Sequence, residues 1–422
     1  MLNLTTRSRT PLQPSTGHDS FADWRRYTVN RGTLPVIGVT GSRGKTTVIR
    51  LLNAILRNAG LRTAIRTNVS VDICDVRQLG EIAPWSRALE ELALGSLDVA
   101  VEEFDWLTIH SMGLEQATFP AFVITNVCGN RDACLVQGDA KRAIASLPIV
   151  FESVHEDGML IINGDDFDVS REELEHRRAS LFVGLNRESP GLRDHLARGG
   201  KAAFSDGGTL MVGDAEKSLE VVAASDLPFA LFGYAGFQIQ NALMAAAIAT
   251  SIGLKANDIS RALQTFDSAD FWTPESFQVI DVNGISVVVD RPNPSWFLRA
   301  VLRSVRDIPS NRIISVVGRL AGVPVSDLPE VGRLIGRTSS FVVVHSESDE
   351  PTRAAAIRQG AARNEVPAVI VHTRSEGRAL SRALSLARAG DLVLVLADRP
   401  APLIQTLIRA AGSTPPARPA AT

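Results

Sequence analysis

The chain alternates between short apolar runs and longer segments in which apolar residues recur at helical spacing. The apolar runs predict strands at 36–39, 97–101, 120–126, 158–163, 313–317, 341–345, 368–371 and 391–397. The helical spacing predicts helices at 46–59, 84–93, 241–252, 256–264, 296–305, 325–337 and 375–389. Strands that alternate with helices predict α/β architecture with parallel, doubly wound sheets, in which ligands bind at the carboxyl ends of strands.

Breaks in this pattern predict the domain organisation. The segments 277–282 and 285–290 flank Asn283-Gly284 and predict a β-hairpin. The stretch 267–278 before them is irregular and mildly acidic, so a domain boundary is expected near residue 270. We therefore expect an N-terminal arm at 1–33 with a short helix near 21–27, a central domain at 34–270, a C-terminal domain at 271–411 and a disordered Pro/Ala-rich tail at 412–422.

Composition narrows the class of protein. Of the 422 residues 45% are hydrophobic and 21% are charged, which is typical of a folded globular chain. The net charge of −2 argues against nucleic-acid binding, and three scattered cysteines argue against a disulfide framework or a zinc site. The N-terminus has no apolar signal-peptide core, and the apolar run 242–254 is too short to span a bilayer. We expect a cytoplasmic chain without a membrane span, and a homo-oligomer stays open.

The sequence VIGVTGSRGKTT at 36–47 carries the clearest chemical signal. An apolar strand end leads into a turn in which Gly41 and Gly44 permit close backbone approach, and a helical pattern follows. The N-terminal N–H groups of that helix form an anion site, Lys45 can reach outer phosphates, and Thr46 or Thr47 can ligate magnesium. The pattern predicts a nucleoside triphosphate site. The full P-loop pattern needs glycine at Val39, so only the shorter G-x-x-G-K-T-T form is present, and an ordinary strand–turn–helix corner is the alternative.

Further motifs follow the loop in a fixed order. They are PWS at 84–86, VEE at 101–103, VITNV at 123–127, DGMLIINGDD at 157–166, QNAL at 240–243 and GDLVLVLAD at 390–398. Together with the loop they resemble the Mur ligase family. The resemblance is strongest to the Mur-like half of cyanophycin synthetase, and looser to the ligase subunit of poly-γ-glutamate synthetase.

The resemblance implies a P-loop-type central domain with a mostly parallel sheet, followed by a C-terminal Rossmann-like α/β domain. It implies ATP and Mg²⁺ as cofactors, and amide-bond formation in which ATP phosphorylates a carboxylate and an amine then attacks the acyl phosphate. The triphosphate would bind the loop residues Gly41, Ser42, Arg43, Gly44, Lys45, Thr46 and Thr47.

The resemblance also assigns residues outside the loop. Glu103, with Thr46, would hold the metal; Glu102 beside it points to the other side of an extended segment, so only one of the two faces the metal. Asn241 would contact adenine, with a helix N-cap as the alternative. Asp290 and Asn293 would lie near the nucleotide, with turn-forming roles as the alternative.

Several positions depart from the family pattern. The family's Asp-His pair is replaced by Asn130-Arg131, and Arg131 would either neutralise phosphate charge in place of a metal or mark a lost second metal site. Leu147 stands near the position of a carbamylated lysine. Ser276 replaces an ATP-contacting arginine, and the linker motif at 290–294 is one residue short. We expect Lys45, Glu103 and Arg131 to carry the catalysis if the chain is active.

Two functions are therefore open. The first is an ATP-dependent carboxylate–amine ligase acting on an amino acid, peptide or polyamino acid. The second is a nucleotide-binding relative without ligase turnover that acts as a partner or regulatory subunit. Only about 33 residues precede the loop, so a soluble UDP-muramoyl substrate is not expected. No ATP-grasp half is present, so if the product is a polymer, a second biosynthetic subunit must supply the other step. A plain P-loop kinase or ATPase is a weaker third hypothesis.

Overall fold

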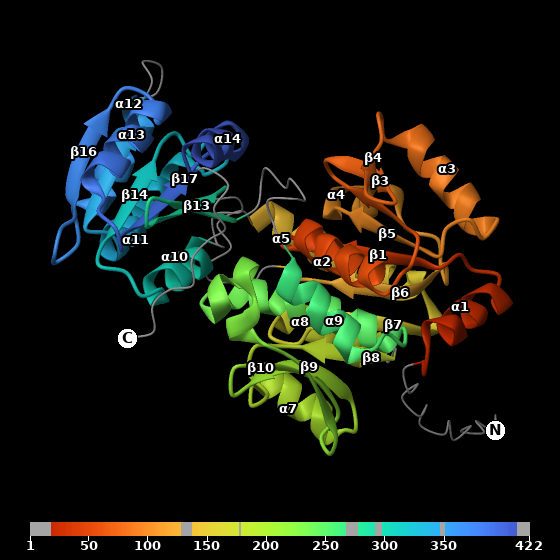
Figure 1. Ribbon diagram of the computed structural model, residues 1–422. Helices are drawn as coiled ribbons and strands as arrows, with labels where there is room; N and C mark the ends of the chain where they lie inside the picture. Colours follow the sequence, from red (N-terminus) through yellow and green to blue (C-terminus); the bar gives the residue numbers. More distant parts are fainter. Residues whose placement is uncertain are drawn as a thin grey trace, which may run out of the picture.

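The computed structural model describes residues 18–127, 137–176, 179–266, 277–291, 298–346 and 351–411, which form two sheets. Figure 1 shows the larger sheet with its helices in red to green, and the smaller one in cyan to blue beside it. The predicted boundary near residue 270 and the tail at 412–422 lie outside the described residues. Among the described residues, no helix combines the length and apolarity needed to cross a bilayer.

The larger sheet has the strand order β11-β10-β9-β8-β7-β6-β1-β5-β2-β3-β4. The run from β9 to β2 is parallel, and antiparallel pairs extend it at both edges. Its strands are β1 Val36–Thr40, β2 Thr63–Thr67, β3 Ser70–Ile73, β4 Val76–Arg77, β5 Val99–Phe104, β6 Phe119–Ile124, β7 Val154–Asn163, β8 Ser180–Val183, β9 Lys201–Asp206, β10 Thr209–Gly213 and β11 Ser218–Ala223. In sequence, β1 is followed by strands on one side and later by strands on the other, so its carboxyl end is a topological switch point where ligands bind in open α/β sheets.

Helices cover both faces of this sheet. They are α1 Phe21–Asn30, α2 Lys45–Asn58, α3 Ile82–Ala93, α4 Trp106–Met112, α5 Gln137–Ser153, α6 Phe167–His176, α7 Pro190–Ala197, α8 Gly236–Ser251 and α9 Ala256–Thr265, with the 3₁₀ turns η2 Ala224–Asp226 and η3 Pro228–Gly233. One core packs α2, α8 and α9 onto the sheet, and the other packs α3, α4, α5 and α7 onto the opposite face. Trp24 of α1 is 2% exposed in the first core, so the helix within the expected arm packs onto the central domain.

The smaller sheet has the order β12-β13-β17-β14-β15-β16. Its elements are β12 Gln278–Val282, β13 Ile285–Asp290, α10 Leu298–Asp307, β14 Ile313–Val317, η5 Val325–Asp327, α11 Leu328–Thr338, β15 Phe341–His345, α12 Pro351–Ala361, β16 Val369–Thr373, α13 Glu376–Leu386, β17 Leu392–Leu396 and α14 Pro400–Ala411. Helices α10, α11 and α12 pack on one face, and α13 and α14 pack on the other. Figure 1 shows α14 and α11 on opposite sides of this sheet.

The predicted fold class is confirmed, since both sheets are mostly parallel and covered by helices. The predicted hairpin is β12–β13, and Asn283 and Gly284 both have positive φ, which suits a two-residue primed turn. Each predicted strand and helix is present, and the largest shift is at α8, which begins at Gly236 rather than 241. This places Asn241 in the helix interior, so the alternative that it caps the helix is wrong.

Candidate nucleotide and substrate site

The loop between β1 and α2 has a backbone path that requires glycine at two positions. Gly41 has φ of 140° and Gly44 has φ of 92°, a region that side chains rarely adopt. A Cβ on Gly41 would lie 1.9 Å from Thr125 Oγ1, and a Cβ on Gly44 would lie 2.5 Å from Asn241 Oδ1. The glycine spacing in the sequence therefore reflects contacts that the loop makes with α8 and with the residues that follow β6.

The residues that follow β6 hold this loop in place. Thr125 Oγ1 and Asn126 Nδ2 both donate to the carbonyl of Arg43, at 2.7 Å and 2.9 Å. The Arg43 N–H donates to Asn126 Oδ1 at 3.1 Å, and the Ser42 N–H donates to the Asn126 carbonyl at 2.9 Å. Trp106 Nε1 also donates to Ser42 Oγ at 3.2 Å. The VITNV motif is thus the scaffold that shapes the loop.

Lys45, Thr46 and Glu103 meet at the N-terminus of α2. Thr46 Oγ1 donates to Glu103 Oε2 at 2.8 Å, and Lys45 Nζ lies 3.6 Å from Glu103 Oε1. Lys45 Nζ also donates to the Gly41 carbonyl at 2.9 Å. Glu103 reaches them because β5 lies beside β1 in register, with Val39 opposite Glu103, and it is 7% exposed. Thr47 lies one residue further along the first turn of α2 and is half-buried.

The adjacent hydroxyl and carboxylate oxygens of Thr46 and Glu103 fit a magnesium ion, because Mg²⁺ prefers hard oxygen ligands and binds through one or two carboxylates beside phosphates. Glu102 faces away from them, as the sequence predicts, and accepts from Arg66 Nη1 at 2.7 Å. Within the described ranges, no group of three His, Cys, Asp or Glu side chains could hold a metal ion alone. An ion at Thr46 would therefore need phosphate or water oxygens as further ligands.

The remaining predicted site residues are distributed as follows. Asn241 is buried beside Gly44, and its Nδ2 donates to Gln238 Oε1 at 2.9 Å. Asp290 ends β13 and forms an ion pair with Arg43 of the loop. Arg131 and Asn293 lie outside the described residues, as do Asn130 and Ser276. Leu147 lies on α5 and is fully buried in the core, so the position near the family's modified lysine carries no polar group.

Asp166 contacts the residues after β6 that hold the loop. Its Oδ2 accepts from the Val127 N–H at 2.8 Å, and its Oδ1 accepts from the Asp168 N–H at 3.1 Å. Burial raises the pKa of Asp166 to about 6, although the backbone N–H donors, which favour the charged form, oppose the shift. Sequence comparison identified the DGMLIINGDD motif, but only the structure shows that its last aspartate fixes the residue after Asn126.

This raised pKa leads to a test of stability. The folded-state pKa of about 6 exceeds the ordinary aspartate pKa of 3.8, so protonated Asp166 contributes stability that is full below about pH 4 and is lost as the pH rises through 6. We expect the free energy of unfolding of wild type, relative to Asp166→Asn, to increase by about 2–3 kcal/mol between pH 7 and pH 4. Urea unfolding of both proteins at pH 7, 5.5 and 4 measures this. A difference that does not change with pH would contradict it.

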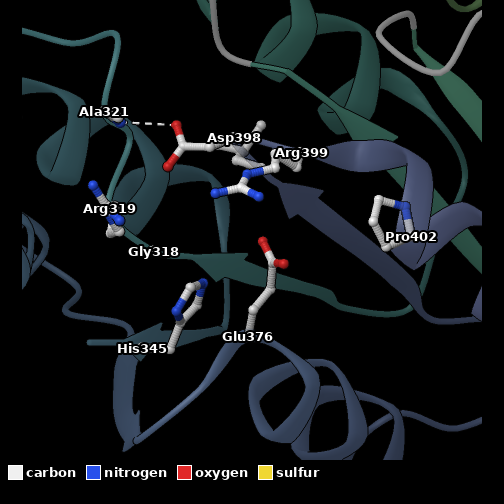
Figure 2. A pocket seen from close by; sticks show the side chains of 9 residues that line it. Gly318, Arg319, Ala321, His345, Glu376, Asp398, Arg399 and Pro402 are labelled. Carbon is white, nitrogen blue, oxygen red and sulfur yellow. Dashed lines mark hydrogen bonds between the residues drawn. The ribbon is translucent and has the colours of Figure 1, made fainter. Parts of the chain in front are cut away.

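A cavity of about 370 Å³ opens at the carboxyl edge of the smaller sheet. Figure 2 shows Arg319, Asp398 and Arg399 on one side of it, with His345 and Glu376 on the other. The backbone N–H of Ala321 donates to Asp398 Oδ1 at 2.8 Å, which ties two of its lining loops together. The cavity therefore brings together cationic and anionic side chains from the segments that follow β14, β16 and β17.

The carboxyl edge of the smaller sheet borders this cavity and also contacts the nucleotide loop. Asp290 at the end of β13 is in register with Leu396 of β17, which lines the cavity, and Leu396 is in register with Val317, just before Gly318 of the lining. Asp290 forms an ion pair with Arg43, with 2.6 Å between Arg43 Nη2 and Asp290 Oδ1. Because neighbouring strands lie about 5 Å apart, the cavity begins within two strand spacings of the carboxylate that contacts the loop.

The sequence motifs did not predict a function for the cavity residues. One signal was present, since Arg319, Asp398 and Glu376 each stand shortly after an apolar strand run, where parallel sheets gather ligands. Their convergence depends on the strand order β17-β14-β15-β16, which local patterns do not reveal.

Comparisons with known proteins agree with these two units. The model of the Mur ligase middle domain matches residues 39–249, and the model of the Mur ligase glutamate ligase domain matches residues 277–399. A cyanophycin synthetase of Trichormus variabilis is 27% identical over 376 residues, which cover 87% of this chain and 41% of that protein. This chain thus spans less than half the length of that relative.

Two further similarities extend the comparison. A UDP-N-acetylmuramoyl-L-alanyl-D-glutamate–2,6-diaminopimelate ligase of Solibacter usitatus is 24% identical, with 86% of this chain and 72% of that protein covered. The structure of E. coli FolC in complex with ADP, without folate substrate, superposes with a TM-score of 0.61 at 16% identity and covers 94% of this chain and 96% of FolC. The similarity to FolC establishes a shared fold. The two family models match the two parts of the chain in order, and the loop contacts both the residues that follow β6 and the Glu103 carboxylate. The chain therefore belongs to the Mur ligase family.

Proposed function

We propose that this protein is an ATP-dependent carboxylate–amine ligase that forms an amide bond through an acyl phosphate. The observation that carries the proposal is the contact of Lys45, Thr46 and Glu103 at a helix N-terminus, next to a sheet edge that bears a charged cavity. A P-loop hydrolase needs only the first of these features. A ligase needs both, because it must hold a nucleotide and an amine substrate together.

The loop residues suit phosphoryl transfer. The N–H groups at the start of α2 and the Lys45 ammonium would offset negative charge on the transferring phosphoryl group. Thr46 and Glu103 would hold a magnesium ion, which would neutralise negative charge on the phosphates. A carboxylate oxygen of the acid substrate attacks the γ-phosphorus, the bond to the β-phosphate bridging oxygen breaks, and ADP leaves. An amine nitrogen then attacks the acyl carbon, loses a proton and displaces inorganic phosphate.

The cavity suits an amino acid or a peptide end as the amine substrate. Such a substrate carries an ammonium or amine and a carboxylate, and the lining offers Arg319 and Arg399 to the carboxylate and Glu376 and Asp398 to the nitrogen. Its volume of about 370 Å³ is within the range of small-molecule sites. These features support an amino-acid or peptide acceptor without identifying the side chain that is recognised.

The test is release of ADP from Mg·ATP in the presence of pools of amino acids and short peptides. We expect one acidic and one amine component to raise ADP release together, and Arg399→Ala to raise the KM for the amine by about 10- to 10²-fold, since a hydrogen bond to a charged group is lost. Arg409→Ala, on the exposed far end of α14, is the matched control and should leave the KM unchanged.

The alternative is a nucleotide-binding relative without turnover. It would be supported if Mg·ATP binds to the wild type but no pool raises ADP release above the background of Lys45→Ala. That outcome would overturn the ligase proposal.

A further inference from the structure

One side chain joins the nucleotide loop to the C-terminal sheet. Arg43 Nη2 donates to both carboxylate oxygens of Asp290, at 2.6 Å and 2.8 Å, and Arg43 Nη1 donates to the Arg291 carbonyl at 3.0 Å. The planar guanidinium thus contacts a side chain and the adjacent backbone at the end of β13. Such two-pronged contacts fix orientation as well as distance.

Both ends of this link are anchored. On the loop side, the Arg43 carbonyl accepts two hydrogen bonds and its N–H donates a third, all to Thr125 and Asn126 after β6. On the sheet side, Ala397 after β17 donates its N–H to the Asp290 carbonyl at 3.0 Å. Ala397 lies between Leu396 and Asp398 of the cavity lining. The link therefore runs from the scaffold of the nucleotide loop to the wall of the cavity.

Burial makes this pair sensitive to the loss of one partner. The Asp290 side chain is 0% exposed and the Arg43 side chain is 15% exposed. Burial raises the pKa of Asp290, and the charge of Arg43 opposes this shift. Without Arg43 the carboxylate would be buried without its cation, a state that proteins avoid by opening or rearranging. Loss of either partner should loosen the same contact.

We propose that Arg43 and Asp290 are a positioning pair that sets the distance between the nucleotide loop and the C-terminal cavity. This inference rests on the proposed function, because the distance matters only if groups bound at the two places react. It differs from the expectation that each residue contacts the nucleotide independently. In the proposed role, the Arg43 side chain is directed at Asp290 and only its backbone shapes the phosphate loop.

A double-mutant cycle separates the two roles. If the residues act as a pair, Arg43→Met and Asp290→Asn should each lower kcat by about 10²-fold, as a displacement of about 1 Å can do, and the double variant should lose the same factor and no more. The Kd for Mg·ADP should stay near the wild-type value in all three, whereas Lys45→Ala weakens it. Arg43→Lys keeps the charge and should recover part of the rate lost in Arg43→Met.

Other results would overturn the inference. Losses that multiply in the double variant, or a weaker Kd for Mg·ADP in Arg43→Met alone, would show that the residues contact the nucleotide independently. An unchanged kcat in both single variants would also contradict the pairing. Thermal unfolding of each variant shows whether it folds. If Arg43→Met does not fold, kcat and the Kd for Mg·ADP are compared with those of Arg43→Lys, which preserves the buried charge pair.

A second measurement does not depend on ligase turnover. Small-angle scattering of the full chain with Mg·ADP should give a larger radius of gyration for Arg43→Met and Asp290→Asn than for wild type. If wild type shows no acceptor-dependent ADP release, the proposed function fails while this measurement still tests the pair. Equal radii in all variants would contradict the positioning role.

Discussion

Lys45→Ala should reduce nucleotide-dependent turnover by about 10³-fold, the range for loss of one preorganised group that stabilises developing charge. Lys45 is placed for this role because its Nζ lies at the loop, 2.9 Å from the Gly41 carbonyl and 3.6 Å from Glu103 Oε1. The substitution removes the Lys45 ammonium but leaves the N–H groups of α2, so some affinity for Mg·ADP should remain. ADP release at saturating ATP, with calorimetric titration of Mg·ADP, measures both effects.

The control for this variant is Lys217→Ala. Lys217 is exposed at the β10–β11 turn, where removal of a lysine changes the net charge equally but affects no loop contact. Lys45→Met is a further check, because it keeps most of the side-chain volume beside the buried Glu103. If Lys45→Met keeps wild-type turnover, the phosphate-binding role of the ammonium is wrong.

The sequence was sufficient to predict the features that depend on local pattern. The loop at 41–47 was recognisable because glycine, lysine and threonine act within one strand–turn–helix unit, and the β12–β13 hairpin was recognisable from Asn283-Gly284. The strands of the two sheet centres are long apolar runs because both of their faces are buried. Strands such as β9 Lys201–Asp206 and β10 Thr209–Gly213 lie toward one edge, mix polar and apolar residues, and gave no comparable signal.

The features that depend on strand order could not be predicted from pattern alone. Glu103 contacts Thr46 because β5 lies directly beside β1, although 57 positions separate the two residues in sequence. Only the family resemblance selected Glu103 over Glu102. The pair of Arg43 and Asp290 spans 247 positions and joins the two sheets, so no local rule could relate them. The sequence thus identified both residues as site candidates but assigned them to the nucleotide rather than to each other.

Glu103→Gln should raise the Mg²⁺ concentration needed for half-maximal turnover and lower the maximal rate by about 10²-fold, because a metal ligand is neutralised without a change of shape. The amide oxygen can still accept the hydrogen bond that Thr46 Oγ1 donates at 2.8 Å, so the fold around α2 should survive. Magnesium titrations of ADP release, with thermal unfolding as a check, measure this effect.

Glu102→Gln is the matched control, since it removes the same charge from the neighbouring residue on the same strand. Glu102 faces Arg66 instead of the loop, with 2.7 Å between Arg66 Nη1 and Glu102 Oε1. Alternation along β5 directs the two side chains to opposite faces of the sheet, so only the Glu103 variant should change the magnesium requirement. If Glu102→Gln shifts the magnesium midpoint as far as Glu103→Gln does, the shift reports the lost negative charge in general and the metal site at Thr46 and Glu103 is wrong. If only Glu103→Gln shifts the magnesium midpoint, the metal lies on the side of β5 that faces the loop, between β5 and the N-terminus of α2.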